Sequence, residues 1–120
     1  MNFDELKAVL RTFADERDWD QFHSPKNLSM ALSVEVAELL EHFQWLTEAE
    51  SRELPSETAE RVAAEIADIQ IYLVRLADKL GVDIEAAVGR KIELNRLRYP
   101  ADEARGDASK YTKYARDPKA

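Results

Sequence analysis

Two pairs of acidic residues in this sequence have the spacing and setting of a metal site. Glu35 and Glu38 occur in "EVAELLEHF", and Glu65 and Asp68 occur in "EIADIQIYL", which overlies the first stretch after a shift of thirty residues. Within each pair the acids lie one helical turn apart, on the same flank of an apolar stripe. If the two helices pack antiparallel through these stripes, we expect four carboxylates to converge on one rim.

Converging carboxylates repel one another at short range and need a cation to offset the charge. Hard divalent ions prefer oxygen ligands, so the pattern predicts Mg²⁺, with Mn²⁺ as the alternative ion. The competing interpretation is a non-catalytic helical interaction module, in which the acids are solvated flanks. A carboxylate-bridged di-iron bundle is disfavoured because the sequence has no Glu-x-x-His pair.

An aromatic loop precedes the first acidic stretch. Trp19, Phe22 and His23 lie among polar residues in "RDWDQFHSPKN", and Trp45 follows the acids. Aromatic side chains in such a loop can stack on a nucleobase. The alternative is that they cover the core, which is the commoner role of buried aromatics.

A basic stripe is predicted near the end of the chain. Lys91, Asn95 and Arg98 follow i, i+4, i+7 spacing, so they share one face of a helix. Their side chains can reach phosphate oxygens and a base edge, although a solvated stripe with snorkelling stems is the alternative. Carboxylates that can bind a cation, a basic stripe and an aromatic loop together favour a nucleoside triphosphate as the ligand.

Composition limits the class of protein. The 120 residues carry 17 Lys plus Arg against 24 Asp plus Glu, a formal net charge of −7, and no cysteine. This balance argues against nucleic-acid and membrane partners, and the lack of cysteine excludes disulfides and thiolate metal sites. Without a long apolar run or a signal-like segment, we expect a cytoplasmic protein.

The elements that must position these residues are helices. Apolar periodicity predicts an all-α, four-helix bundle-like domain in residues 1–100, followed by a polar, partly mobile tail in 101–120. Ser24, Thr47 with Glu50, Ser56 and Asp83 are expected to cap helices, and Gly81 to end one. The expected helices span 3–17, 24–46, a short turn near 47–54, 56–80, and 83 to just before Pro100.

Longer stretches resemble a known family. "ERDWDQFHSPKNLSMALSVEVAELLEHFQW", "AEIADIQIYLVRLA" and "KIELNRLRYP" are similar to the MazG-like all-α nucleotide pyrophosphohydrolases, and most of all to the small single-domain dCTP pyrophosphatases. The resemblance spans roughly residues 13–100, and "SKYT" at residues 109–112 is a further similar segment. It implies Mg²⁺-dependent hydrolysis of a nucleoside triphosphate to the monophosphate and pyrophosphate, for control of the nucleotide pool. The base preference it implies is dCTP, with another pyrimidine triphosphate or a damaged nucleotide as the next choice.

The resemblance also assigns roles to individual residues. It implies that Glu35, Glu38, Glu65 and Asp68 hold the metal, with Glu38 our candidate for the catalytic carboxylate that orients or deprotonates water. The sequence leaves open which of the four acts. The implied contacts to the nucleoside and phosphates come from Trp19, His23, Trp45, Lys91, Asn95, Arg98 and Tyr99.

Assembly is the last expectation. Val34 and Trp45 lie off the main stripe of their helix, and Leu94 and Leu97 lie off that of theirs. A partner subunit would cover these side chains. Members of the resembled branch form dimers or tetramers, so a homodimer or homotetramer is expected.

Overall fold

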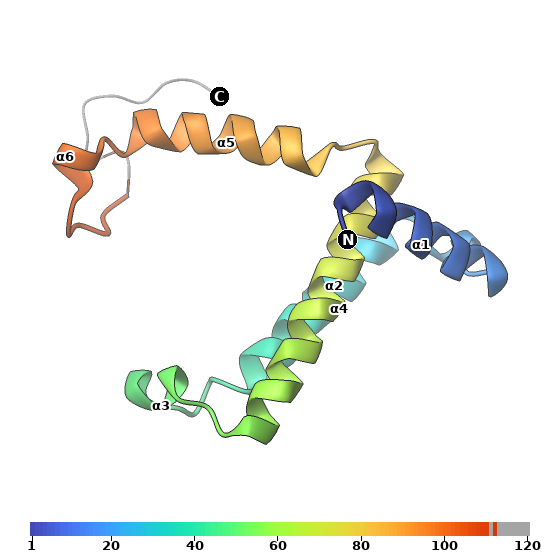
Figure 1. Ribbon diagram of the computed structural model, residues 1–120, viewed down its shortest axis with the longest axis horizontal. Coiled ribbons are helices and arrows are strands. Elements are labelled where there is room, and N and C mark those ends of the chain that lie inside the picture. The colour runs from blue at the N-terminus through green and yellow to red at the C-terminus, as the bar shows by residue number, and fades with distance from the viewer. Residues whose placement is uncertain (111, 113–120) are drawn as a thin grey trace. The chain divides into compact units, whose positions relative to one another are not determined.

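The computed structural model describes residues 1–110 and 112, and in that part of the chain every element is helical (Figure 1). The all-α prediction is therefore confirmed, and no helix among these residues is long and apolar enough to cross a membrane. The elements are α1 (Phe3–Glu16), the 3₁₀ helix η1 (Asp20–Phe22), α2 (Pro25–Glu41), α3 (Glu48–Arg52), α4 (Ser56–Leu80), α5 (Ile84–Arg98) and α6 (Ala101–Ala104). They divide into two units, Met1–Val82 and the chain from Asp83 onward.

Helix ends follow the predicted caps in most cases. The Ser24 hydroxyl accepts a hydrogen bond from the Asn27 amide at 3.1 Å, and Asp83 caps α5 by accepting from the Ala86 amide at 3.0 Å. Thr47 starts α3 with a complete capping box, and Gly81 ends α4 with a left-handed φ of 67°. Ser56 is not a cap, because it is the first helical residue and Pro55 takes the cap position without a side-chain bond.

The second helix is shorter than expected. α2 ends at Glu41, whereas the periodicity predicted helix to about residue 46. After Glu41 the backbone tightens into turns, with the His42 amide donating to the Leu39 carbonyl and the Phe43 amide to the Leu40 carbonyl. Bonds of this i to i−3 type close the last turn and leave Trp45 beyond the regular helix.

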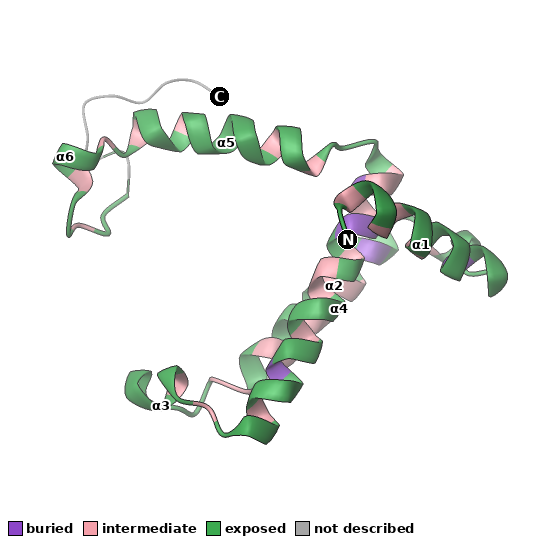
Figure 2. Cartoon of the chain, viewed as in Figure 1, coloured by how far each residue is buried: buried purple, intermediate pink, exposed green. Residues whose placement is uncertain are grey.

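In the first unit, α2 and α4 lie side by side and α1 packs against α4 (Figure 1). Most of the buried positions gather toward the end of the α2–α4 pair on which α1 packs (Figure 2). Val62, in the first half of α4, is also buried. Leu28 of α2 and Val74 of α4 are each only 1% exposed. Close packing at this junction fixes the register of α2 on α4, and the register determines which acids face each other.

Helical phase predicts that the apolar stripe of α4 consists of Val62, Ile69, Leu73 and Leu76, and this prediction is correct only in part. Val62 is buried, but Leu73 is 40% exposed, and Val74 and Ala77 fill the core instead. Because α1 packs across this end of α4, the buried face of α4 is shifted by one residue from the predicted face. The periodicity of a single helix does not reveal such a shift.

The second unit contains α5 and α6. A short helix at Ala101–Ala104 stands where the sequence suggested an irregular tail, and it begins directly after Pro100, a residue suited to a helix start. The part of the predicted tail at residues 111 and 113–120 lies outside the described residues.

Candidate functional site

Three of the four predicted metal ligands come together between α2 and α4. One carboxylate oxygen from each of Glu35, Glu38 and Glu65 lies within 4.8 Å of the others. Glu35 and Glu38 reach the site from successive turns of α2, and Glu65 reaches it from α4, so the pairing of the helices creates the cluster. All three side chains are half-buried.

Two carboxylate oxygens in this cluster have no partner. Glu35 Oε2 and Glu65 Oε2 are both shielded from solvent and neither accepts a hydrogen bond. A buried charged oxygen without a partner carries its full desolvation cost, so such groups in folded proteins normally bind an ion or a proton. Oxygen donors that are close, shielded and unsatisfied fit a hard divalent cation such as Mg²⁺.

The proton affinity of Glu35 is consistent with this crowding. Burial, together with the neighbouring carboxylate of Glu38, raises the pKa of Glu35 to about 7, and the charges of Asp68 and Glu65 add to the effect. Within residues 1–82, no Lys or Arg forms an ion pair with the three clustered carboxylates. The cluster therefore contains like charges that are not compensated from within this unit.

Asp68, the fourth predicted ligand, is exposed and is not part of the three-residue cluster. Its charge nevertheless contributes to the raised pKa of Glu35, so the carboxylate lies close enough to act on the site electrostatically. Its role as a ligand stays a prediction.

A residue that sequence reasoning missed lies at the edge of the cluster. The His42 Nε2 atom is 3.7 Å from Glu65 Oε1, and both side chains are mostly shielded from solvent. Glu35, Glu38 and His42 follow i, i+3, i+7 spacing, so helical phase alone could have identified His42 as a neighbour. A protonated imidazolium at this position would offset part of the negative charge.

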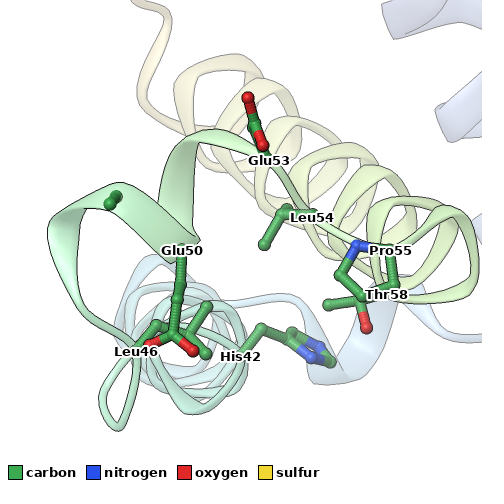
Figure 3. A pocket seen from close by; sticks show the side chains of 8 residues that line it. His42, Leu46, Glu50, Glu53, Leu54, Pro55 and Thr58 are labelled. Carbon is green, nitrogen blue, oxygen red and sulfur yellow. The ribbon is translucent and has the colours of Figure 1, made fainter.

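A pocket of about 640 Å³ opens next to His42, between the turn after α2, helix α3 and the start of α4 (Figure 3). Leu46, Leu54 and Pro55 supply apolar walls, while Glu50 and Glu53 supply carboxylates. None of the predicted site residues lines it. Because its charged groups are acidic, this pocket does not suit the phosphates of a nucleotide.

The aromatic loop lies at the start of α2 and is anchored on both sides. The Trp19 ring packs edge-on against Phe13 of α1, with 5.7 Å between ring centroids, and remains 45% exposed. His23 is half-buried, and its Nδ1 atom accepts a hydrogen bond from Arg75 Nε at 3.1 Å. The loop is therefore held by α1 through an aromatic contact and by α4 through a buried guanidinium.

Arg75 belongs to an ion-pair network that the sequence did not indicate. The side chain is only 5% exposed, and its Nη2 donates to Asp20 Oδ1 at 2.7 Å. Lys79 also donates to Asp20, and Arg11 binds Asp78 through two nitrogens at 2.7 and 2.5 Å. The Arg11 hydrogen bond lowers the pKa of Asp78, against the opposing effect of burial. No local pattern could have revealed these pairs, because their members are more than fifty positions apart.

The remaining predicted residues lie on other elements of the chain. Trp45 is 87% exposed in the turn after α2. Lys91 and Asn95 are exposed on α5, Arg98 ends that helix, and Tyr99 follows it. These four residues belong to the second unit, so their predicted contacts with a nucleotide at the cluster stay predictions.

Paired helices that bring clustered carboxylates together define a helical, acid-lined site, and comparison with known proteins assigns its family. Residues 30–113 match the MazG-like family, and the chain belongs to it. The matched segment contains the whole carboxylate cluster.

Several named relatives are similar over most of this chain. It is 46% identical over 111 residues to dCTP pyrophosphatase 1 of Rattus norvegicus and to that of Homo sapiens, covering 91% of this chain. The match spans 65% of each relative's length, which is less than two thirds. A crystal structure of a pyrophosphatase from Archaeoglobus fulgidus matches with a TM-score of 0.71 and 44% identity, covering 81% of this chain and 91% of that one.

Proposed function

We propose that this chain is a Mg²⁺-dependent nucleoside triphosphate pyrophosphohydrolase, which converts a (deoxy)nucleoside triphosphate and water to the monophosphate and pyrophosphate. One observation supports this most: Glu35, Glu38 and Glu65 converge, with two shielded oxygens left unpartnered. A non-catalytic module would gain nothing from that arrangement, because solvated acidic flanks do not need to converge.

The proposed chemistry requires no covalent nucleophile. Bound Mg²⁺ would neutralise the triphosphate and make a water more acidic. Glu38 orients the attacking water and accepts its proton as the oxygen bonds to the α-phosphorus. The bond from that phosphorus to the bridging oxygen then breaks, and pyrophosphate leaves with its electron pair. Lys91 and Arg98 are proposed to stabilise the charge that develops on the leaving group.

The proposed substrate is dCTP or a related pyrimidine deoxynucleotide. This choice is supported by the likeness to proteins named dCTP pyrophosphatase 1 and by the aromatic loop. In this proposal Trp19 stacks on the base, His23 contacts the base edge, and Trp45, Asn95 and Tyr99 complete the nucleoside contacts. Stacking is sequence-tolerant, so base selection must come mainly from hydrogen bonds.

The proposed assembly is a homodimer or homotetramer. Val34, Trp45 and Leu97 are 55%, 87% and 57% exposed, and Leu94 is half-buried. The described residues bury only five apolar side chains, a small core for a chain of this length. A second copy would remove the exposed apolar side chains from water. Light scattering at micromolar concentration should give a mass of at least two chains, and a monomeric mass would contradict the proposal.

The decisive experiment measures pyrophosphate release from dCTP, dTTP, dUTP, dATP and the ribonucleotides, with Mg²⁺ and with a chelator. We expect release from pyrimidine deoxynucleotides, dCTP first, and none with the chelator. Release of inorganic phosphate instead would place the cleavage at another bond. Absence of release from every nucleotide in Mg²⁺ or Mn²⁺ would favour the interaction module.

Base recognition is tested by Trp19→Ala and His23→Ala. Loss of stacking should raise KM about tenfold to a hundredfold with little change in kcat. His23→Ala should reduce the preference among pyrimidine nucleotides without changing the Mg²⁺ dependence. If both variants lower the rates for all nucleotides equally, the loop has a structural or catalytic role instead.

A further inference from the structure

The contacts of His23, a residue of the proposed base site, determine which of its two ring nitrogens carries the proton. Its Nδ1 atom lies 3.1 Å from Arg75 Nε, which carries a proton and has no lone pair to accept with. The imidazole nitrogen must therefore be the acceptor. A neutral imidazole has one donor and one acceptor nitrogen, so the proton of His23 lies on Nε2.

Arg75 is itself held in place, which makes this contact a fixed feature of the loop. The guanidinium is nearly fully buried, and it donates from Nε to His23 and from Nη2 to Asp20 at 2.7 Å. Both acceptors belong to the same loop, so the planar fork of one side chain spans Asp20 and His23. Lys79 binds Asp20, and Arg75 Nη1 lies 3.6 Å from Asp78, which Arg11 also binds.

Burial and the nearby positive charges oppose the protonation of His23. Burial lowers the pKa of His23, and the positive charge of Arg75 lowers it further. Lys79 acts in the same direction, whereas Asp20 opposes it. The charged groups come from α4 and η1, and together with burial their balance favours the neutral imidazole.

We propose that Arg75 is a positioning residue that fixes His23 as the neutral Nε2–H tautomer, so that this imidazole offers the substrate a hydrogen-bond donor and no acceptor. This inference rests on the proposed function only where it concerns the substrate. Cytosine has an acceptor at N3, whereas thymine and uracil have an N–H there. A fixed donor opposite N3 favours cytosine, because with thymine or uracil two hydrogen-bond donors would face each other.

The tautomer can be read directly by a long-range ¹H–¹⁵N correlation spectrum of the full chain labelled with ¹⁵N-histidine. The sequence has only two histidines, so His23→Gln assigns the signals. In the wild type at pH 7 we expect a protonated Nε2 and an unprotonated, hydrogen-bonded Nδ1 for His23. In Arg75→Gln the His23 signals should become those of mixed tautomers, and the pKa of His23 should rise.

Arg11→Gln is the matched control. It removes the other guanidinium bound to Asp78 without touching His23, so the His23 signals should not change. Arg75→Gln should lower the ratio of kcat/KM for dCTP over dUTP by about two- to tenfold, the value of one hydrogen bond. That loss should fall mainly on KM, and Arg11→Gln should keep the ratio.

Two results would overturn the proposal: a proton on His23 Nδ1 in the wild type, or an unchanged His23 spectrum in folded Arg75→Gln. Because the spectrum needs no substrate, it decides the role of Arg75 even if no nucleotide is hydrolysed. Loss of all hydrolysis would count against the proposed function alone. If Arg75→Gln changes the His23 tautomers as expected but leaves the ratio of kcat/KM for dCTP over dUTP unaltered, the role of this donor in selectivity is overturned.

Discussion

The helix pair α2–α4 and its flanking loop carry two clusters of charged residues with opposite organisation. In the carboxylate cluster, Glu35, Glu38 and Glu65 face one another, and within residues 1–82 the only basic side chain close to them is His42, which lies 3.7 Å from Glu65. In the network around Arg75, positive and negative side chains alternate from α1 through the loop to α4. Both clusters are partly shielded from water, so their charges interact more strongly than they would on an open surface.

This difference separates a cluster that lacks compensating charge from a network whose charges compensate one another. In the network around Arg75, the charged groups of the arginines, Lys79, Asp20 and Asp78 are paired with one another within the protein. The carboxylate cluster leaves shielded oxygens of Glu35 and Glu65 unpartnered, so it is completed only by a cation or a proton. Changes in the two clusters should therefore affect different observables.

The largest effect is expected from Glu38→Gln, which removes one charge and keeps the size of the side chain. Loss of a proton acceptor and metal ligand should lower kcat by about 10²–10⁴-fold, with the far-ultraviolet circular dichroism unchanged. Glu60→Gln, an exposed acid on α4, is the control and should retain full activity. Turnover of Glu38→Gln close to the wild type would refute the assignment.

The next effect concerns the stability gained from the metal. At a Mg²⁺ concentration of a hundred times its Kd, the free energy of unfolding should rise by about 2.7 kcal/mol. In Glu65→Gln this gain should largely disappear, while the metal-free variant should be at least as stable as the wild type because repulsion is relieved. Urea unfolding at matched ionic strength measures both. Equal Mg²⁺ stabilisation of wild type and variant would mean that the ion binds elsewhere.

A third effect tests the structural role of the network. Arg75→Gln leaves Asp20 and His23 without their buried donor, which should cost about 1.5–3 kcal/mol of unfolding free energy. Arg61→Gln breaks an exposed pair with Glu57 on the same helix and should cost no more than about 0.5 kcal/mol. Urea denaturation without metal compares the two. Similar losses in both variants would show that burial adds nothing to the Arg75 pairs.

The last effect is a difference in sign between two contributions to the pH dependence of stability. The pKa of Glu35 in the folded chain is about 7, above its ordinary value of 4.5. The metal-free folded state therefore binds more protons than the unfolded state between these pH values, and its stability falls as pH rises through them. The pKa of Asp78 is lowered, so its contribution is present above its ordinary value of 3.8 and is lost as pH falls through the folded pKa.

Urea midpoints from pH 3 to 8 measure both slopes. Glu35→Gln should flatten the decline between about pH 4.5 and 7, and Arg11→Gln should reduce the loss below pH 4. A wild-type stability that rises steadily from pH 4.5 to 7 would contradict the raised pKa of Glu35.

Local sequence accounts for much of the fold. Ser24, Thr47 and Asp83 cap helices because a short polar side chain before a helical stretch satisfies free amides of the first turn. Gly81 ends α4 because a left-handed residue costs glycine little. These choices depend on a few neighbouring residues, so they can be read from the chain alone.

The carboxylate cluster was predictable to the extent that it depends on helical phase. The matching phase of "EVAELLEHF" and "EIADIQIYL" placed Glu35, Glu38 and Glu65 on facing flanks, and the paired helices bring them together. Phase does not fix how far a side chain reaches across the pair, so the exposure of Asp68 could not be foreseen. The contribution of His42 was visible in the same periodicity but was overlooked.

The sequence by itself therefore determined the helical class, most helix ends and the acidic pairs, because each follows from the chemistry of residues a few positions apart. Only the tertiary structure decided the early end of α2, the replacement of Leu73 by Val74 in the core, and the burial of Arg75 beneath the loop. The exchange of Leu73 for Val74 and the burial of Arg75 depend on how α1 and the loop before α2 pack against α4 and on which distant side chains meet there. No local pattern encodes such long-range packing, because its free energy comes from contacts between residues far apart in the chain.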